Sequence, residues 1–301
     1  MAHDHVQRAN RTRLAIAFAI TLSVLAVEVI GALISGSLAL LADAGHVTSD
    51  SIGLLVALIA SAVALRPATD RHTFGFQRTE VLGALINGLL LAVVAVWVAV
   101  EAIQRLLHPG EAQVVALPMI IVAAIGLAAN FAAFLVLRGG DRRSLNLRGA
   151  YLDVLGDMLG SIAALVAAAI ILLTGFATAD AIASLVIAAL IAPRAVLLLR
   201  DVVRVLTESA PRDMNVEKIR EHLVETPGVV AVHDVHVWAI TSGAPVFTAH
   251  VVVESSVFER GETGLMLDRL GECLSGHFDV EHSTFQLEPA GHADREEHAH
   301  R

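Results

Sequence analysis

Two pairs of polar residues, each four positions apart, interrupt long apolar runs of the sequence. His46 and Asp50 form one pair, and Asp153 and Asp157 form the other. Because residues four apart on an α-helix point to nearly the same side, each pair can present both side chains to one neighbour. If the two faces meet, they supply one imidazole nitrogen and three carboxylate oxygens, a ligand set that suits a tetrahedral Zn²⁺ ion.

The alternative is that these groups only hydrogen-bond one another and hold two helices together. Three carboxylates brought together repel one another unless a cation or protons neutralise them. We expect no Lys or Arg in the middle of any span, since Arg194, beside Pro193, lies where a helix is predicted to end. The sequence therefore favours a bound metal ion over a purely structural cluster.

The segments that carry these pairs predict membrane-spanning helices. The composition is 55% hydrophobic, and a helix needs about 20 apolar residues to cross the hydrocarbon layer of a membrane. The predicted fold is an all-α six-helix bundle over residues 14–206, preceded by a cytosolic tail over residues 1–13. Its six spans are 14–34, 38–65, 81–100, 114–137, 151–173 and 181–199.

The arginines predict the orientation of the bundle, since cytoplasmic loops carry an excess of positive charge. They gather before the first span, between the second and third, and between the fourth and fifth, whereas the opposite loops hold only Arg105. We expect a multi-pass protein of the cell membrane with its N- and C-termini in the cytosol. The arginines on the cytosolic side are Arg8, Arg11, Arg13, Arg66, Arg71, Arg78, Arg138, Arg142, Arg143 and Arg148.

Residues 207–290 have the pattern of a small cytosolic α+β domain, followed by a His-containing tail over 291–301. The predicted order is a helix, two strands, a helix and a strand, which suits an open sheet with its helices on one face. Their ranges are 215–225, 229–240, 246–254, 263–274 and 283–287. Residues 208–301 hold 17 Asp or Glu against 7 Lys or Arg, a balance that disfavours nucleic acid and favours cations. The single cysteine, Cys273, excludes a disulfide within the chain.

The segments around the two polar pairs resemble the signature segments of the cation diffusion facilitator family. They are 41–46 with Asp50, 71–76 with Glu80, and 149–153 with Asp157. The resemblance extends over residues 14–290 and is strongest to the bacterial zinc, cobalt and cadmium efflux branch. It implies a homodimer whose protomers each hold a transport site, with a ferredoxin-like cytosolic domain that binds regulatory metal. By position, the transport ligands are His46, Asp50, Asp153 and Asp157.

One position departs from the pattern of that branch, which usually has His where this chain has Asp153. A carboxylate makes the site harder and more negative, so that Mn²⁺, Fe²⁺, Co²⁺ or Cd²⁺ become candidates beside Zn²⁺. Two other acidic residues, Asp43 and Glu28, are candidates either for a polar path or for binding protons in place of metal.

Further metal ligands are expected outside the membrane. The resemblance implies a cytosolic zinc site of His233, His250 and His282 with the carboxylate of Glu288. Weaker candidates are His236, which shares its strand face with Trp238, and Asp70 with His72, beside which Phe76 takes the place of a further histidine. The tails add His3, His5, His298 and His300.

These observations predict a divalent metal/proton antiporter that exports Zn²⁺ from the cytosol. Metal ligands must be deprotonated, so metal ions and protons compete for the same groups. A nucleotide is not an expected partner, because the sequence has no G-x-x-x-x-G-K-[ST] phosphate loop. The alternatives are a membrane-bound metal sensor and an intramembrane metalloprotease. The protease, the only enzyme among the three, would need an H-E-x-x-H segment that the sequence lacks.

Overall fold

The computed structural model describes residues 2–64, 66–109, 113–138, 145–212, 214–241, 243–278, 280, 282–290 and 292. The chain divides into two compact units. One unit consists of Met1–Leu58 with Gly83–Leu199, and the other of Ile59–Leu82 with Arg200–Arg301. Each unit has a hydrophobic core of its own.

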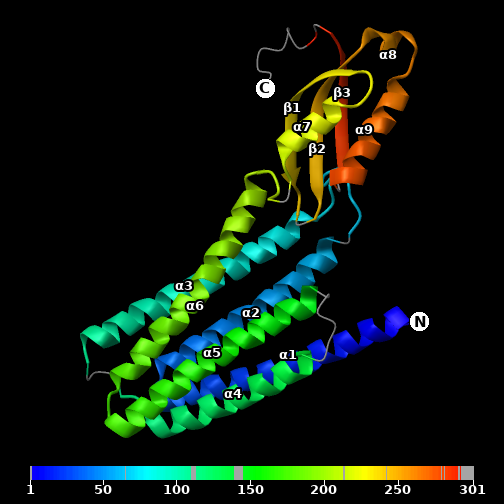
Figure 1. Cartoon of the computed structure of the whole chain (residues 1–301). Coiled ribbons are helices and arrows are strands. Elements are labelled where there is room, and N and C mark those ends of the chain that lie inside the picture. The colour runs from blue at the N-terminus through cyan, green and yellow to red at the C-terminus, as the bar shows by residue number, and fades with distance from the viewer. Residues whose placement is uncertain are drawn as a thin grey trace. The chain divides into compact units, whose positions relative to one another are not determined.

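The described residues up to 206 form six long helices (Figure 1). Five of them contain a segment long and apolar enough to cross a membrane, and the sixth, α2, includes side chains outside the described set. The helices are α1 (Ala2–Ser35), α2 (Leu38–Ala64), α3 (Arg78–Leu107), α4 (Ala116–Arg138), α5 (Leu145–Thr174) and α6 (Thr178–Leu206).

Three of these helices, α1, α3 and α6, extend well beyond the spans predicted from the sequence. Helix α1 already begins at Ala2, inside the segment expected to be a tail. Helix α6 continues to Leu206, so that Pro193 and Arg194 lie in its interior. The prediction that Arg194 sits at a helix end is therefore wrong. Proline removes one backbone hydrogen bond but does not end a helix that its neighbours support.

Small side chains fill the core of the first unit, and large apolar side chains point outward. Its buried cluster is dominated by alanine, as at Ala39 and Ala164, whereas Leu33 and Leu173 are 76% and 83% exposed. Small residues let helices approach closely, and outward-facing leucines find apolar surroundings in lipid tails. This distribution of side chains is typical of a membrane bundle.

A buried carboxylate joins the start of α2 to the start of α6. Asp180, only 1% exposed, accepts hydrogen bonds from the backbone N–H groups of Leu38 (2.8 Å) and Ala39 (3.2 Å). The hydroxyl of Ser37 also donates to it, and Nη1 of Arg105 lies 3.5 Å from its Oδ2 atom. The first N–H groups of a helix have no partner within it, so this carboxylate acts as a cap supplied by another helix.

The second unit contains a three-stranded mixed sheet. Strands β1 and β2 are antiparallel, and β2 and β3 are parallel. The chain order matches the prediction, with one short helix, α8, added. The elements are α7 (Val216–Val224), β1 (Val229–Ala239), β2 (Pro245–Val253), α8 (Ser255–Glu259), α9 (Thr263–Phe278) and β3 (His282–Pro289).

Helices α7 and α9 cover one face of this sheet. Alternate residues of β2, such as Phe247 and Val251, are buried in one core with Leu223 of α7 and Leu270 of α9. Successive side chains of a strand point to opposite faces. His250, which lies between buried positions of β2, therefore belongs to the face away from the helices.

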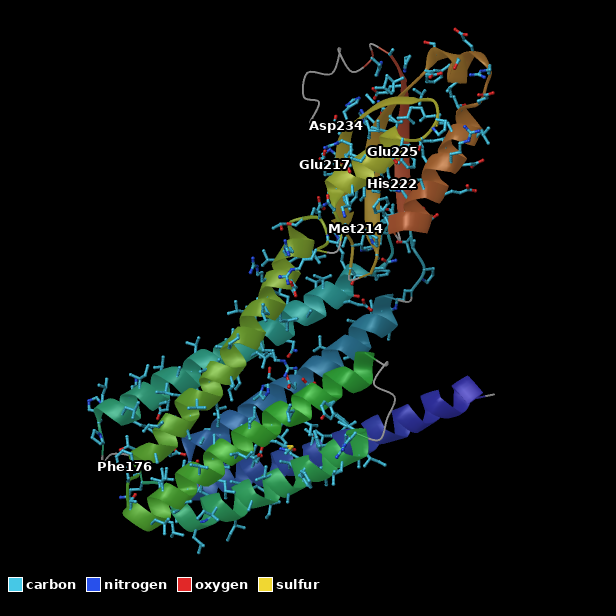
Figure 2. The ribbon with its side chains drawn as sticks, viewed as in Figure 1. Phe176, Met214, Glu217, His222, Glu225 and Asp234 are labelled. Atoms are coloured by element: carbon cyan, nitrogen blue, oxygen red, sulfur yellow. The ribbon has the colours of Figure 1, made fainter. Side chains whose placement is uncertain are left out.

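A bulge in β1 sets the direction of two histidines. His233 pairs with His250 and His236 pairs with Thr248, so that three steps on β1 correspond to two on β2. Asp234, labelled in Figure 2, lies within the bulge and has a positive φ of 46°. The extra residue changes the alternation of side chains, which puts His233 and His236 on the same face.

Candidate metal centres

Helices α2 and α5 carry facing polar side chains in antiparallel register. Ser161 Oγ donates a hydrogen bond to Asp43 Oδ2 at 3.4 Å. One turn further along α2, Nε2 of His46 lies 3.8 Å from Oδ1 of Asp157. Moving forward on α2 thus corresponds to moving backward on α5. The spacing seen in the sequence becomes a ladder of polar pairs between the two helices.

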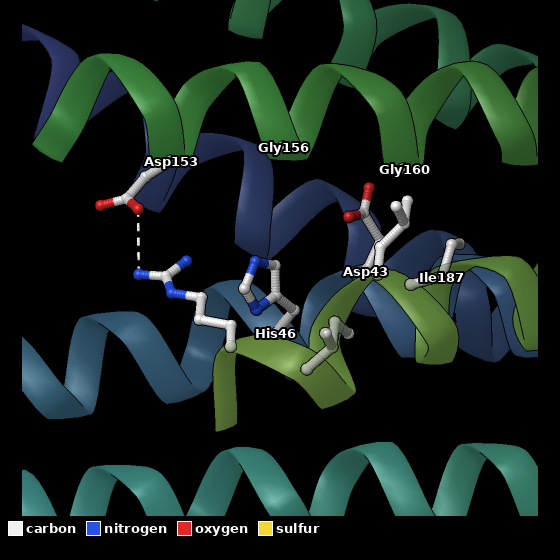
Figure 3. Close-up of a pocket in the computed structure, with 9 residues that line it drawn as sticks. Asp43, His46, Asp153, Gly156, Gly160 and Ile187 are labelled. Atoms are coloured by element: carbon white, nitrogen blue, oxygen red, sulfur yellow. Dashed lines mark ion pairs between the residues drawn. The ribbon is translucent and has the colours of Figure 1, made fainter. Parts of the chain in front are cut away.

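One turn further along the two helices, a basic side chain that was not expected from the sequence contacts Asp50 and Asp153. Nη1 of Arg194 lies 3.1 Å from Asp50 Oδ2, and its Nη2 lies 2.9 Å from Asp153 Oδ1. Figure 3 marks the ion pair of Asp153 with a dashed line. The expectation that no basic side chain reaches these carboxylates is therefore wrong, because α6 continues past Arg194 and holds it against α2 and α5.

Exposure falls steadily along the site. The side chain of Asp153 is 42% exposed, that of Asp50 21%, that of His46 10% and that of Asp157 6%. The site is thus most accessible at Asp153 and closed at Asp157. Ions entering at the Asp153 end would meet the buried ligands last.

Three buried side-chain atoms at this site, each able to coordinate a metal ion, have no hydrogen-bond partner among the described residues. They are His46 Nδ1, Asp50 Oδ1 and Asp157 Oδ1. Leaving a buried polar atom unsatisfied costs about 1–3 kcal/mol. Coordination of a cation would satisfy such atoms, so the chemistry of the donor set fits a divalent metal ion.

A cavity of about 340 Å³ adjoins these residues (Figure 3). Three helices form its walls, and α6 contributes an apolar side with Ile187. The lining residues are Asp43, His46, Asp153, Gly156, Gly160, Ile187, Leu190, Ile191 and Arg194. The cavity therefore runs along the helices from Arg194 to Asp43.

Beyond the cavity lies a second buried acidic group. Glu28 is 1% exposed and Asp43 is 2% exposed. Two glycines give these carboxylates room. A Cβ atom on Gly160 would lie 2.5 Å from Asp43 Oδ1, and one on Gly126 would lie 2.9 Å from Glu28 Oε1. Close helix packing here thus depends on glycine.

A separate group of possible metal ligands lies on the sheet of the second unit. Glu288 is 1% exposed, with Oε2 at 3.1 Å from His233 Nε2 and Oε1 at 2.8 Å from His250 Nδ1. One donor atom from each of these residues lies within 4.8 Å of the others. Two imidazoles and a carboxylate form a ligand set that fits Zn²⁺, with a position left for a further ligand.

His282, the fourth residue expected at this site, is not among them. His250 pairs with Gln286 on β3, whereas His282 pairs with Val246, four residues away along the strand. Four strand residues span about 13 Å. The exposed ring of His282 instead lies 6.1 Å from that of Phe74.

None of the weaker candidates that the structure describes belongs to the group around Glu288. His236 is exposed and is not part of the group around Glu288. Asp70 and His72 are exposed too, and the ring of His72 stacks on Phe76 at 4.5 Å. His298 and His300, with the side chains of His3 and His5, lie outside the described set.

Cys273 is poorly suited to bind metal. Burial raises the pKa of its thiol, and the negative charge of Glu225 raises it further. The thiolate is the form that binds metals and acts as a nucleophile. This cysteine is therefore mainly a protonated thiol at neutral pH.

Sequence reasoning missed Arg194 and Asp180 as parts of the transmembrane architecture. The signal for Arg194 was a basic residue beside Pro193 inside an apolar run. The signal for Asp180 was an acidic residue in the first turn of α6, which normally indicates a favourable interaction with that helix's own start. Neither signal identifies the partner, because both partners lie on other helices.

Comparison with known proteins gives matches along most of the chain. Residues 14–207 match the sequence model of the cation efflux transmembrane domain, and residues 211–290 match that of the cation efflux protein cytoplasmic domain. The chain is 39% identical to the metal cation efflux system protein CzcD of Cupriavidus metallidurans, covering 99% of this chain and 93% of the relative. It is 40% identical to a cadmium, cobalt and zinc/H⁺-K⁺ antiporter of Bacillus velezensis (96% and 92% covered). It is also 40% identical to the zinc transporter ZitB of Escherichia coli K12 (96% and 93% covered).

Proposed function

The chain belongs to the cation diffusion facilitator family of cation efflux proteins, and from this premise we propose that it exports Zn²⁺ from the cytosol in exchange for protons. A member of this family is a transporter and not an enzyme. The names of its relatives, which include cadmium, cobalt and zinc exporters, support the choice of a divalent metal ion. The proposed transport ligands are His46, Asp50, Asp153 and Asp157.

The observation that carries the proposal is the position of His46 between two carboxylates. Its Nε2 atom lies 3.7 Å from Asp50 Oδ2 and 3.8 Å from Asp157 Oδ1. Ligand atoms about 2.0 Å from a tetrahedral Zn²⁺ ion lie roughly 3.3 Å from each other. Both distances exceed this spacing by about half an ångström, and the ligand atoms of His46, Asp50 and Asp157 do not all lie within 4.8 Å of one another. The two carboxylates would therefore move toward each other when zinc binds.

Proton coupling follows from the chemistry of the ligands. The metal ion binds only deprotonated carboxylates and a neutral imidazole, so each binding event competes with protonation. In the proposed cycle the ion enters at the exposed Asp153 end, binds, and leaves on the other side of the membrane. Protons then neutralise the carboxylates for the return of the empty site.

The proposal includes the topology and the assembly of the protein. Helices α1–α6 are six spans, with both termini in the cytosol, and residues 207–290 form a ferredoxin-like domain through which two copies associate. In this domain a regulatory Zn²⁺ ion would be held by His233, His250 and Glu288. Since these ligands come from three strands, the ion would fix the strands to one another.

Transport into proteoliposomes tests this function. Vesicles containing the purified protein and an acidic lumen should accumulate Zn²⁺, and an ionophore that collapses the pH gradient should stop uptake. The same assay with Mn²⁺, Fe²⁺, Co²⁺ and Cd²⁺ in competition ranks the possible substrates. Zinc binding without any flux would reject the antiporter and support a membrane-bound metal sensor.

A further inference from the structure

Arg194 is placed as a counter-ion of the transport site. We propose that Arg194 and the transported ion compete for Asp50 and Asp153. The guanidinium binds both carboxylates when the site holds no metal, and an incoming metal ion displaces it from them. This inference rests on the proposed function, because it assigns a role within the same site.

The contacts of Arg194 reach both helices that carry the ligands. Different nitrogens of the guanidinium contact Asp50 of α2, at 3.1 Å, and Asp153 of α5, at 2.9 Å. Arginine is always charged and its planar group suits two acceptors at once. One side chain of α6 thus links α2 to α5 where the site is most exposed.

Competition follows from a shared oxygen atom. Asp50 Oδ2, which contacts Arg194, also lies 3.7 Å from His46 Nε2. A metal ion coordinated by His46 and Asp50 would therefore approach the guanidinium closely, and like charges repel strongly where water is scarce. The side chain of Arg194 is 42% exposed. It is therefore not enclosed by the helices and has room to move away from the carboxylates when the metal binds.

The charges of the site explain why a cationic side chain would occupy it when no metal ion is bound. Three carboxylates and a neutral imidazole carry three negative charges, and burying them without a cation is costly. Arg194 leaves a net charge of minus two in the empty site. When the metal replaces the guanidinium, the charge is minus one. The arginine therefore stabilises the empty site, weakens metal binding and assists release of the ion.

Zinc binding to the purified full-length protein tests the competition, measured against a chelating dye. All variants carry Glu288→Gln, which removes the carboxylate of the cytosolic centre, so that the transport site dominates the signal. Arg194→Gln keeps much of the length and polarity but removes the charge, and Arg194→Lys keeps the charge. We expect Arg194→Gln to lower the dissociation constant for Zn²⁺ by about tenfold or more, the effect of one nearby charge on an ionisation equilibrium. Arg194→Lys should remain within about threefold of the wild type, since the charge persists. Arg200→Ala, which removes an exposed arginine of the same helix, should bind like the wild type.

Flux measurements separate a counter-ion from a merely structural residue. Arg194→Gln should retain exchange of internal for external Zn²⁺ but slow net efflux, because protons alone must then neutralise the carboxylates of the returning site. Arg194→Gln should raise the affinity less in the Asp153→Asn background than in the wild-type background, since one partner of the arginine is already neutral there. A structural role would instead lower binding, exchange and thermal stability together.

The outcomes distinguish this inference from the proposed function. Unchanged or weaker Zn²⁺ binding by folded Arg194→Gln, while Asp157→Ala abolishes binding, would overturn the inference alone. If Asp157→Ala bound Zn²⁺ as tightly as the wild type, the proposed transport site itself would be wrong. Tighter binding by Arg194→Gln with normal binding by Arg194→Lys supports competition.

Discussion

Nε2 of His46 lies 3.8 Å from Oδ1 of Asp157, and this contact joins two helices that are far apart in the sequence. It sits at the closed end of the site, where the Asp157 side chain is only 6% exposed. Water gives little help in solvating a charge at such a position. Whatever neutralises Asp157 must come into the site, as a metal ion or as protons.

Replacing Asp157 should therefore stop transport. Asp157→Asn keeps the shape of the side chain but removes the charged ligand. We expect Zn²⁺ uptake to fall by about 100-fold or more, since even groups that only support a ligand are worth about 10–100-fold in metal affinity. Uptake into acidic-lumen proteoliposomes measures the effect. Asp201→Asn, which breaks an exposed ion pair with Arg212, is the control, and retained transport in Asp157→Asn would remove this residue from the ligand set.

The carboxylate of Asp153 should influence which metals are carried. Asp153→His replaces a hard oxygen ligand by an imidazole, which favours Zn²⁺ over Mn²⁺. We expect transport to persist, with the preference for zinc over manganese increased about tenfold, or roughly 1.4 kcal/mol. Uptake of each metal in the presence of the other gives the ratio. An unchanged ratio would show that Asp153 does not determine selectivity.

Gly160 should tolerate no side chain. Gly160→Ala would place a Cβ atom 2.5 Å from Asp43 Oδ1 and displace a carboxylate that Ser161 holds. Such overpacking costs about 1–3 kcal/mol, and we expect a lower midpoint of thermal unfolding in detergent.

Gly156, one turn away on the same helix, provides the matched control for stability. A Cβ atom there meets nothing within 4 Å, and alanine is favoured over glycine in a helix by about 0.5–1 kcal/mol. Gly156→Ala should therefore unfold at the same temperature or slightly higher. Equal losses in both variants would show that the close approach at Asp43 is unimportant.

The cytosolic centre should depend on Glu288 and not on His282. Glu288→Gln removes the carboxylate that contacts both His233 and His250, whereas His282 lies elsewhere on β3. In the Asp157→Asn background, where the transport site is disabled, we expect Glu288→Gln to weaken zinc binding by about tenfold or more. His282→Ala should bind normally. Metal content after equilibrium dialysis provides the measurement, and a loss in His282→Ala would place this residue in the site after all.

The thiol of Cys273 should react slowly with maleimide at neutral pH. Because burial and Glu225 raise its pKa, the thiolate is scarcer than in an exposed cysteine of ordinary pKa, and the rate should rise about tenfold per pH unit up to the raised pKa. The same shift links stability to pH, since the unfolded chain loses this proton first. The contribution of the protonated thiol to the free energy of unfolding is fully present below the pKa of the unfolded chain, ordinarily 9.0. It is lost as the pH rises through the raised pKa of the folded protein. Cys273→Ala gives the background, and labelling as fast as that of a small free thiol would contradict the prediction.

The sequence indicated the local features of the fold well, because they depend on spacing. Residues four apart, as at His46 and Asp50, remain on one helix face wherever the helix lies, and the cytosolic helices and strands begin and end close to their predicted limits. The contact of Arg194 with two carboxylates could not be predicted, because it depends on how far α6 continues and which helices it packs against. Local irregularity also matters: the bulge at Asp234 decides which way His236 points.

The cap that Asp180 provides for α2 limits how the bundle can change shape. Leu38 and Ala39 have their first backbone N–H groups satisfied by a carboxylate of another helix. If the starts of α2 and α6 separated, these buried groups would lose their partner, so the two starts should behave as a single pivot. In the proposed transport cycle, the site opens first to one side of the membrane and then to the other. The accompanying movement would then be greatest at the opposite ends of these helices, toward Asp50 and Arg194.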